Sequence, residues 1–290
     1  MIETDSITRL ITISLVAALA GCGGANLSTI DPGGGASSRT VVTVRATRID
    51  NSAASSAVAE VPASMSPSVP GTLKGQILID GPAPKLTALV KAGLSKVDPT
   101  VCAHSNDIPD ESMLVSGGGG LKNVFVFLDK APDWYKDKPT VEPSLDQKAC
   151  LFHPHALIVP VGATFLLKNS DTVAHNVKTE PGVNTGQNDG MPPGSSMTML
   201  FKRAEKKPFQ SKCAIHPWME FYTLTLNHPF SAISDSDGRF EIKDLRAGKY
   251  KFRVWHERNR ELDAVAVEIK GGETKALSLK YKGDSFGSKW

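Results

Sequence analysis

The chain has 290 residues, of which 40% are hydrophobic and 22% are charged, and its formal net charge is +3. This length accommodates one or two domains with hydrophobic cores and an additional unstructured portion. The charge is small and scattered, and no basic cluster is interleaved with aromatic residues, so the composition excludes a nucleic-acid-binding surface.

A short apolar stretch near the N-terminus indicates export. Residues 11–20 are apolar, but this stretch is well below the roughly 20 residues that a membrane span needs. It ends in Leu19-Ala-Gly-Cys22, followed by two glycines, and resembles a bacterial lipoprotein signal. The resemblance implies that residues 1–21 are removed and that Cys22 is lipidated. The protein would then lie on the periplasmic or extracellular side of the bacterial cell envelope and touch the membrane only through its anchor. An ordinary secretory signal cut elsewhere, or a buried apolar helix, would explain the same stretch.

Residues 22–70 have the composition of a tether. They are rich in Ser, Ala, Gly, Thr and Pro, contain few aromatic residues and show no sustained hydrophobic period. Such a segment buries too little apolar surface to offset the entropy lost on ordering. We therefore expect a disordered linker.

Strand patterns begin directly after the linker. Residues 71–81 and 121–128 both have the pattern of β-strands. Between them, residues 84–97 carry apolar side chains at helical spacing, which predicts one short helix over the sheet. Every other segment reads as strands and turns, so we expect an all-β fold.

Four potential metal ligands lie further along the chain. They are one upstream imidazole and then a thiolate, an imidazole and a thioether in one short run: His175, Cys213, His216 and Met219. Each of these residues alone is more often a core or surface residue than a ligand. Together they form the donor set of a copper site, because sulfur donors disfavour calcium and magnesium and a weak axial thioether disfavours tetrahedral zinc. The pattern predicts one copper ion.

Two extended segments flank the ligand run, at residues 209–213 and 220–226. A tight proline-containing loop between neighbouring strands can direct three side chains at one ion. His175 would reach the same ion from another strand end. The metal would then link segments of a β-sandwich that are distant from each other in the sequence.

Over residues 145–226 the chain resembles the cupredoxin family, and its ligand loop, Cys-x-x-His followed by Pro, an aromatic residue and Met, is similar to that of amicyanin. The resemblance implies a Greek-key β-sandwich with one type 1 copper ion, which passes single electrons between redox donor and acceptor proteins as a monomer. It assigns Asn176 to pinning the backbone near Cys213. The electron would leave through the ring edge of His216, inside an apolar docking patch formed by Pro217 and Trp218.

The C-terminal part carries a second resemblance. Residues 233–254 contain two alternating strand patterns punctuated by Asp-Gly and Ala-Gly turns, as in the later half of a carboxypeptidase regulatory-like (transthyretin-like) β-sandwich. The opening strand typical of that family occurs instead at residues 71–81. We therefore expect a cupredoxin-like domain, residues 131–227, inserted in a transthyretin-like domain made of residues 71–130 and 228–290. A tandem arrangement, with residues 71–130 in an extended cupredoxin sheet, is the alternative.

The cysteine count fits an exported metalloprotein. Lipidation of Cys22 and ligation by Cys213 leave Cys102 and Cys150 as a possible disulfide. A disulfide between Cys213 and Cys150 would instead abolish the copper site. His153 and His155 are expected to be structural or exposed, because the local sequence supplies no carboxylate or cysteine partner.

An enzymatic role is not expected. The chain has no additional histidine cluster with the spacing of a type 2 or trinuclear copper site, and no nucleophile elbow. Two alternatives to electron transfer remain. One is a non-redox adhesion or binding lipoprotein, metal-free or zinc-bound, and the other is a copper storage or delivery protein.

Overall fold

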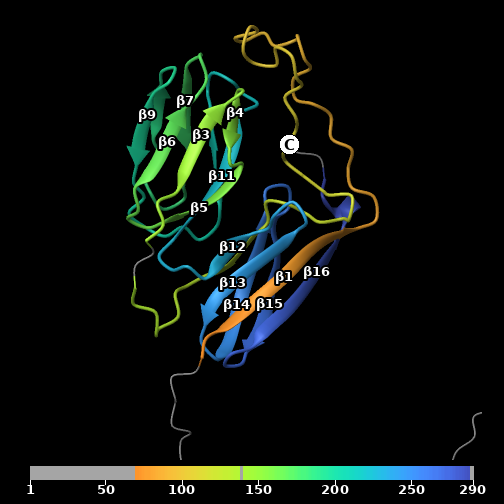
Figure 1. Cartoon of the computed structure of the whole chain (residues 1–290), viewed down its shortest axis with the longest axis vertical. Helices are drawn as coiled ribbons and strands as arrows, with labels where there is room; N and C mark the ends of the chain where they lie inside the picture. Colours follow the sequence, from red (N-terminus) through yellow and green to blue (C-terminus); the bar gives the residue numbers. More distant parts are fainter. Residues whose placement is uncertain (1–68, 138–139, 288–290) are drawn as a thin grey trace, which may run out of the picture. The chain divides into compact units, whose positions relative to one another are not determined.

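The computed structural model describes residues 69–137 and 140–287. The predicted lipoprotein signal, Cys22 and the linker up to residue 68 lie outside these residues. The described chain forms sixteen β-strands in four sheets and one short 3₁₀ helix, η1 (Gly283–Ser285) (Figure 1). The expected all-β sandwich fold is confirmed. Among the described residues, no helix is long and apolar enough to cross a membrane.

Two of the sheets form what we call the ligand sandwich. Their strand orders are β5-β11-β10-β7-β8 and β4-β3-β6-β9. The five-stranded sheet contains β5 (Ala156–Pro160), β7 (His175–Thr179), β8 (Asn188–Met191), β10 (Phe209–Lys212) and β11 (Glu220–Leu226). The four-stranded sheet contains β3 (Ser144–Lys148), β4 (Leu151–His153), β6 (Phe165–Asn169) and β9 (Ser196–Met199). One core of buried apolar side chains, rich in phenylalanine, joins the two sheets.

The other two sheets form the flanking sandwich, with strand orders β13-β1-β16 and β12-β2-β14-β15. Its strands are β1 (Gly71–Asp80), β2 (Phe125–Leu128), β12 (Ser231–Ile233), β13 (Arg239–Leu245), β14 (Gly248–His256), β15 (Arg260–Ile269) and β16 (Thr274–Lys282). In Figure 1, β1 (orange) lies between β13 and β16 (blue), antiparallel to the first and parallel to the second. Strands from before residue 131 thus pair with strands from after residue 228. The domain limits themselves stay a prediction.

The helix expected over residues 84–97 is absent, and this expectation was wrong. Residues 82–115 form an irregular segment, which we call the covering segment. Within it, Gly93 and Asp98 have φ angles of +73° and +45°, which a right-handed helix does not contain. Pro99 further disfavours helical geometry at the residue before it. Local backbone preferences therefore override the apolar spacing.

His153 and His155 differ in their surroundings. His153 is exposed, whereas His155 is buried. Nε2 of His155 lies 2.5 Å from a carboxylate oxygen of Glu257, and its Nδ1 lies 3.7 Å from one of Glu111. Both histidines fit the structural or exposed role expected for them. The carboxylate partners are distant in the sequence, so the local pattern could not reveal them.

Candidate metal centre

The four predicted ligands lie where three neighbouring strands begin or end. β10 pairs antiparallel with β7 on one side and with β11 on the other. His175 begins β7, Cys213 directly follows β10, Met219 directly precedes β11, and His216 lies in the loop that joins β10 to β11. All four side chains are buried, with exposed fractions of 1% or less. The sheet register therefore brings them to one end of the ligand sandwich.

Main-chain hydrogen bonds close the ligand loop. The N–H of Cys213 donates to the carbonyl of Met219 at 3.0 Å, and the N–H of Met219 donates to the carbonyl of His216 at 2.9 Å. Nδ1 of His216 lies 3.7 Å from Sγ of Cys213 and 2.9 Å from Nδ1 of His175. The donor atoms of these three residues all lie within 4.8 Å of one another. They form a compact cluster that one ion could join.

The residues present fit a copper ion. A thiolate and two imidazoles supply the soft and intermediate donors that copper prefers. Met219 is fully buried in the same apolar cluster as Cys213, and its thioether would supply the weak fourth donor. A structural zinc site would more often use four strong nitrogen or thiolate donors.

Cys213 is a free thiol whose surroundings favour the thiolate. Burial raises its pKa, but hydrogen bonds from His175, His216 and the backbone lower that pKa to about 5. Burial lowers the pKa of His175, but Asp171 and Cys213 raise it to about 9. Because the thiolate is the form that binds metals, the sulfur is ready to coordinate at neutral pH.

Asn176 holds the backbone around Cys213. Its side-chain oxygen accepts a hydrogen bond from the N–H of Ala214 at 2.6 Å and lies 3.2 Å from Sγ of Cys213. The backbone N–H of Asn176 donates to the same sulfur at 3.5 Å. The side-chain amide is fixed in turn by Asn188, to which it donates. These contacts match the role expected for Asn176.

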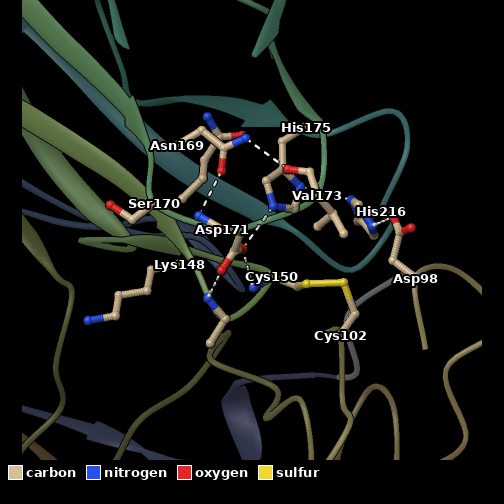
Figure 2. Close-up of polar contacts among 12 residues, drawn as sticks. Asp98, Cys102, Lys148, Cys150, Asn169, Ser170, Asp171, Val173, His175 and His216 are labelled. Atoms are coloured by element: carbon tan, nitrogen blue, oxygen red, sulfur yellow. Dashed lines mark hydrogen bonds and ion pairs between the residues drawn. A yellow bond between two sulfur atoms is a disulfide. The ribbon is translucent and has the colours of Figure 1, made fainter. Parts of the chain in front are cut away.

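Each of the two histidines has a carboxylate at the ring nitrogen that faces away from the donor cluster (Figure 2). Nε2 of His175 lies 2.9 Å from Asp171, and Nε2 of His216 lies 3.0 Å from Asp98. A carboxylate that accepts the remote N–H fixes the tautomer and orientation of the ring and leaves Nδ1 for a metal. The sequence analysis missed both aspartates. Asp171 precedes His175 by four residues, whereas Asp98 is 118 residues from His216 and offers no local signal.

Asp171 is itself held firmly. Its carboxylate accepts backbone hydrogen bonds from Ala149 at 2.6 Å and Cys150 at 2.8 Å. Burial raises the pKa of Asp171, but these bonds and the one from His175 hold it below its ordinary value. The side-chain oxygen of Asn169 accepts from the N–H of Asp171 at 3.0 Å. The turn that presents His175 is therefore well constrained.

A disulfide joins Cys102 of the covering segment to Cys150 of the ligand sandwich (Figure 2). This is the pairing expected from the cysteine count, and Cys213 takes no part in it. The indole N–H of Trp218 donates to the carbonyl of Cys150 at 3.0 Å. The disulfide and the ligand loop are thus linked directly.

The ring edge of His216, through which the electron is expected to leave, does not reach the surface. His216 is fully buried, because Asp98 of the covering segment lies over its Nε2. Of the two residues predicted to form a docking patch, Pro217 is exposed and Trp218 is half-buried. A separate surface hollow of about 560 Å³, lined in part by His175, Ala214 and the exposed Ile215, lies next to the donor cluster. Of the four predicted ligands, only His175 lines this hollow.

No family model matches the chain, and no curated protein matches it either. Solved structures of copper proteins are similar to parts of it. A copper-containing nitrite reductase from Thermus scotoductus SA-01 is 16% identical over 34% of this chain, with a TM-score of 0.28. A purple cupredoxin from Nitrosopumilus maritimus is 20% identical over 29% of this chain and all of its own, with a TM-score of 0.26. Amicyanin from Paracoccus versutus is 17% identical over 31% of this chain and 86% of its own, with a TM-score of 0.27.

These similarities are too distant to assign a function. The matched part spans only 25% of the nitrite reductase. The case for a metal centre therefore rests on the geometry and chemistry of the donor cluster in this chain.

Proposed function

We propose that this protein is a type 1 copper protein of the bacterial cell envelope that carries single electrons between redox partner proteins. The observation that carries the proposal is the convergence of two imidazole Nδ1 atoms and one low-pKa thiol within 4.8 Å, next to a buried methionine. Copper bound there would supply a one-electron couple.

The protein itself supplies donor side chains that are fixed in position and shielded from water. His175, Cys213 and Met219 are fixed at strand ends, and Asn176 holds the backbone at the thiolate. Fixed donors limit the rearrangement that accompanies a change of charge, and this favours rapid electron exchange. Burial of all four side chains excludes water from the donor atoms.

The rest of the proposal concerns location and partners. Lipid attached to Cys22 would hold the protein at the membrane, and the linker would allow a reach of about 5–6 Å times the square root of its length. Pro217 and Trp218 remain the proposed docking residues for a redox donor or acceptor, and the protein would act as a monomer. It would not be an enzyme.

The proposal is tested by adding one equivalent of Cu(II) to the purified full chain and recording its visible and EPR spectra. We expect an intense visible band and a small copper hyperfine splitting, because both arise from a short copper–thiolate bond. Cys213→Ser should abolish the band. His153→Ala, which removes an exposed histidine outside the cluster, should leave it unchanged.

Two results would contradict electron transfer through a type 1 site. The first is a colourless copper complex with ordinary hyperfine splitting, and the second is preferential retention of zinc when copper is supplied. The zinc result would favour the non-redox binding protein. Rapid loss of a coloured copper ion to a chelator would favour storage or delivery.

A further inference from the structure

His216 is held from outside its own loop. In the described structure its Nδ1 faces the donor cluster and its Nε2 is bonded to Asp98 at 3.0 Å. Asp98 is 38% exposed while the imidazole beneath it is fully buried. The carboxylate is therefore the group that separates this ring from solvent on the Nε2 side.

The position of Asp98 is fixed by a local turn. Its carbonyl accepts hydrogen bonds from the N–H groups of Val101 and Cys102 at 2.9 and 2.8 Å. Its φ of +45° lies in the left-handed region, which aspartate enters more readily than most residues. The turn ends at Cys102, so the residue that contacts His216 and the residue that forms the disulfide belong to one short unit.

The disulfide connects this unit to the other histidine. Cys150 donates its N–H to Asp171, the partner of His175. This disulfide also lies close to both histidines of the donor cluster. Donor atoms of Cys102, Cys150 and His216 lie within 4.8 Å of one another, and so do those of Cys150, Asp171 and His175. The Cys102–Cys150 bond thus connects the Asp98–His216 pair to the Asp171–His175 pair.

From these contacts we propose that Asp98 is a positioning residue for His216, and that the Cys102–Cys150 disulfide keeps it in place. The aspartate holds the imidazole with Nδ1 turned to the metal and shields its other edge. Removal of either the carboxylate or the disulfide frees the ring to turn and exposes it to solvent. This inference deepens the proposed function and rests on it for the metal, but the placement of the ring is a property of the metal-free protein.

The first test uses the metal-free full chain. Histidines are labelled with diethyl pyrocarbonate, which acylates accessible imidazole nitrogens, and the sites are quantified by mass spectrometry. We expect His216 to be protected in the parent protein and to be labelled at least tenfold faster in Asp98→Ala. His175, which keeps Asp171, should stay protected in that variant, and exposed His153 should react equally in both proteins.

Matched variants separate positioning from a general loss of structure. Asp107→Ala removes another aspartate of the covering segment, one that bonds Lys91 and Ala92 instead of a histidine, and should leave His216 protected. Asp98→Asn keeps a hydrogen-bond acceptor of the same size, so His216 should be labelled at an intermediate rate in that variant. The double variant Cys102→Ser, Cys150→Ser should expose His216 as Asp98→Ala does. Continued protection of His216 in Asp98→Ala would overturn the inference.

The second test measures Cu(II) affinity in the same set of proteins. Loss of a carboxylate that supports a ligand histidine typically weakens metal affinity by about 10- to 100-fold. We expect that loss in Asp98→Ala, partial rescue in Asp98→Asn and no change in Asp107→Ala. Unchanged affinity in Asp98→Ala would count against a positioning role.

The two proposals can fail separately. If Asp98→Ala exposes His216 but the parent protein gives no thiolate band with Cu(II), the placement of the ring stands and electron transfer fails. If the parent protein gives the band and His216 stays protected without Asp98, electron transfer stands and the inference fails.

Discussion

At the scale of single residues, Cys213 and His175 form a buried thiolate–imidazolium pair. Hydrogen bonds overcome the effect of burial and bring the pKa of Cys213 to about 5 and that of His175 to about 9, from ordinary values of 9.0 and 6.5. Between pH 5 and pH 9 both groups are charged in the folded, metal-free protein. The pair thus makes the stability of the metal-free protein depend on pH.

We expect the metal-free protein to gain stability from pH 5 to about 6.5 and then to level off up to pH 9. In the first window Cys213 is protonated only in the unfolded chain, so stability rises with pH. Above pH 6.5 the unfolded chain also loses the His175 proton that the folded state retains, and the two effects cancel. Cys213 should supply about 2 kcal/mol of this gain, measured as the free energy of unfolding in urea.

Cys213→Ser is the control for this pH dependence. Without the thiol the rise between pH 5 and 6.5 should shrink to the part that comes from His228 and His256. Burial lowers the pKa of His228 to about 4 and that of His256 to about 3, so both are neutral in the folded protein in this window while the unfolded chain still protonates them. The remaining effect of His175, which keeps Asp171, should make stability fall above pH 6.5. A rise of unchanged size in the variant would place its origin elsewhere in the protein.

At the scale of elements, the ligand loop could be predicted because its information is local. Cys213, His216 and Met219 share one run, and the strand patterns on both sides of it are clear. The covering segment could not be predicted in the same way. The cysteine count predicts its link to Cys150, but its contact with His216 joins residues 118 apart in the sequence, and no local pattern indicates that contact. Its apolar spacing suggested a helix, which its backbone geometry at positive φ does not allow.

The pairing of early and late strands in the flanking sandwich can be tested at one glycine. Gly120 forms an isolated bridge with Leu78 of β1, and a Cβ added there would meet the backbone of Asp237, next to β13. Backbone cannot move aside as a flexible side chain can. Gly120→Ala should therefore lower the free energy of unfolding by about 1–3 kcal/mol, the usual cost of overpacking.

Gly117→Ala is the matched control for Gly120→Ala. It lies on the same turn, and an added Cβ would meet nothing within 4 Å. We expect a change of no more than about 0.5 kcal/mol. Equal effects at the two positions would mean that residues near 120 do not pack against the Asp237 turn.

At the scale of the whole described chain, β11 is buried on both faces. Alternate residues of a strand face opposite sides, and Phe221 on one side belongs to the core of the ligand sandwich. On the other side Tyr222, Leu224 and Leu226 join a second apolar cluster, with Phe127 among the residues that the flanking sandwich contributes. The strand that follows Met219 is therefore stabilised from both sandwiches.

A double-mutant cycle between Leu224 and Phe127 tests whether the flanking sandwich supports the strand that carries the metal site. Leu224→Ala should cost about 2–5 kcal/mol, because the side chain is fully buried. If both side chains pack in one layer, Leu224→Ala and Phe127→Ala should couple by about 0.5–3 kcal/mol. Leu73→Ala, in the separate core of the flanking sandwich, should add to Leu224→Ala without coupling. Additive costs for Leu224 and Phe127 as well would show that β11 gains no stability from its contact with Phe127 of the flanking sandwich.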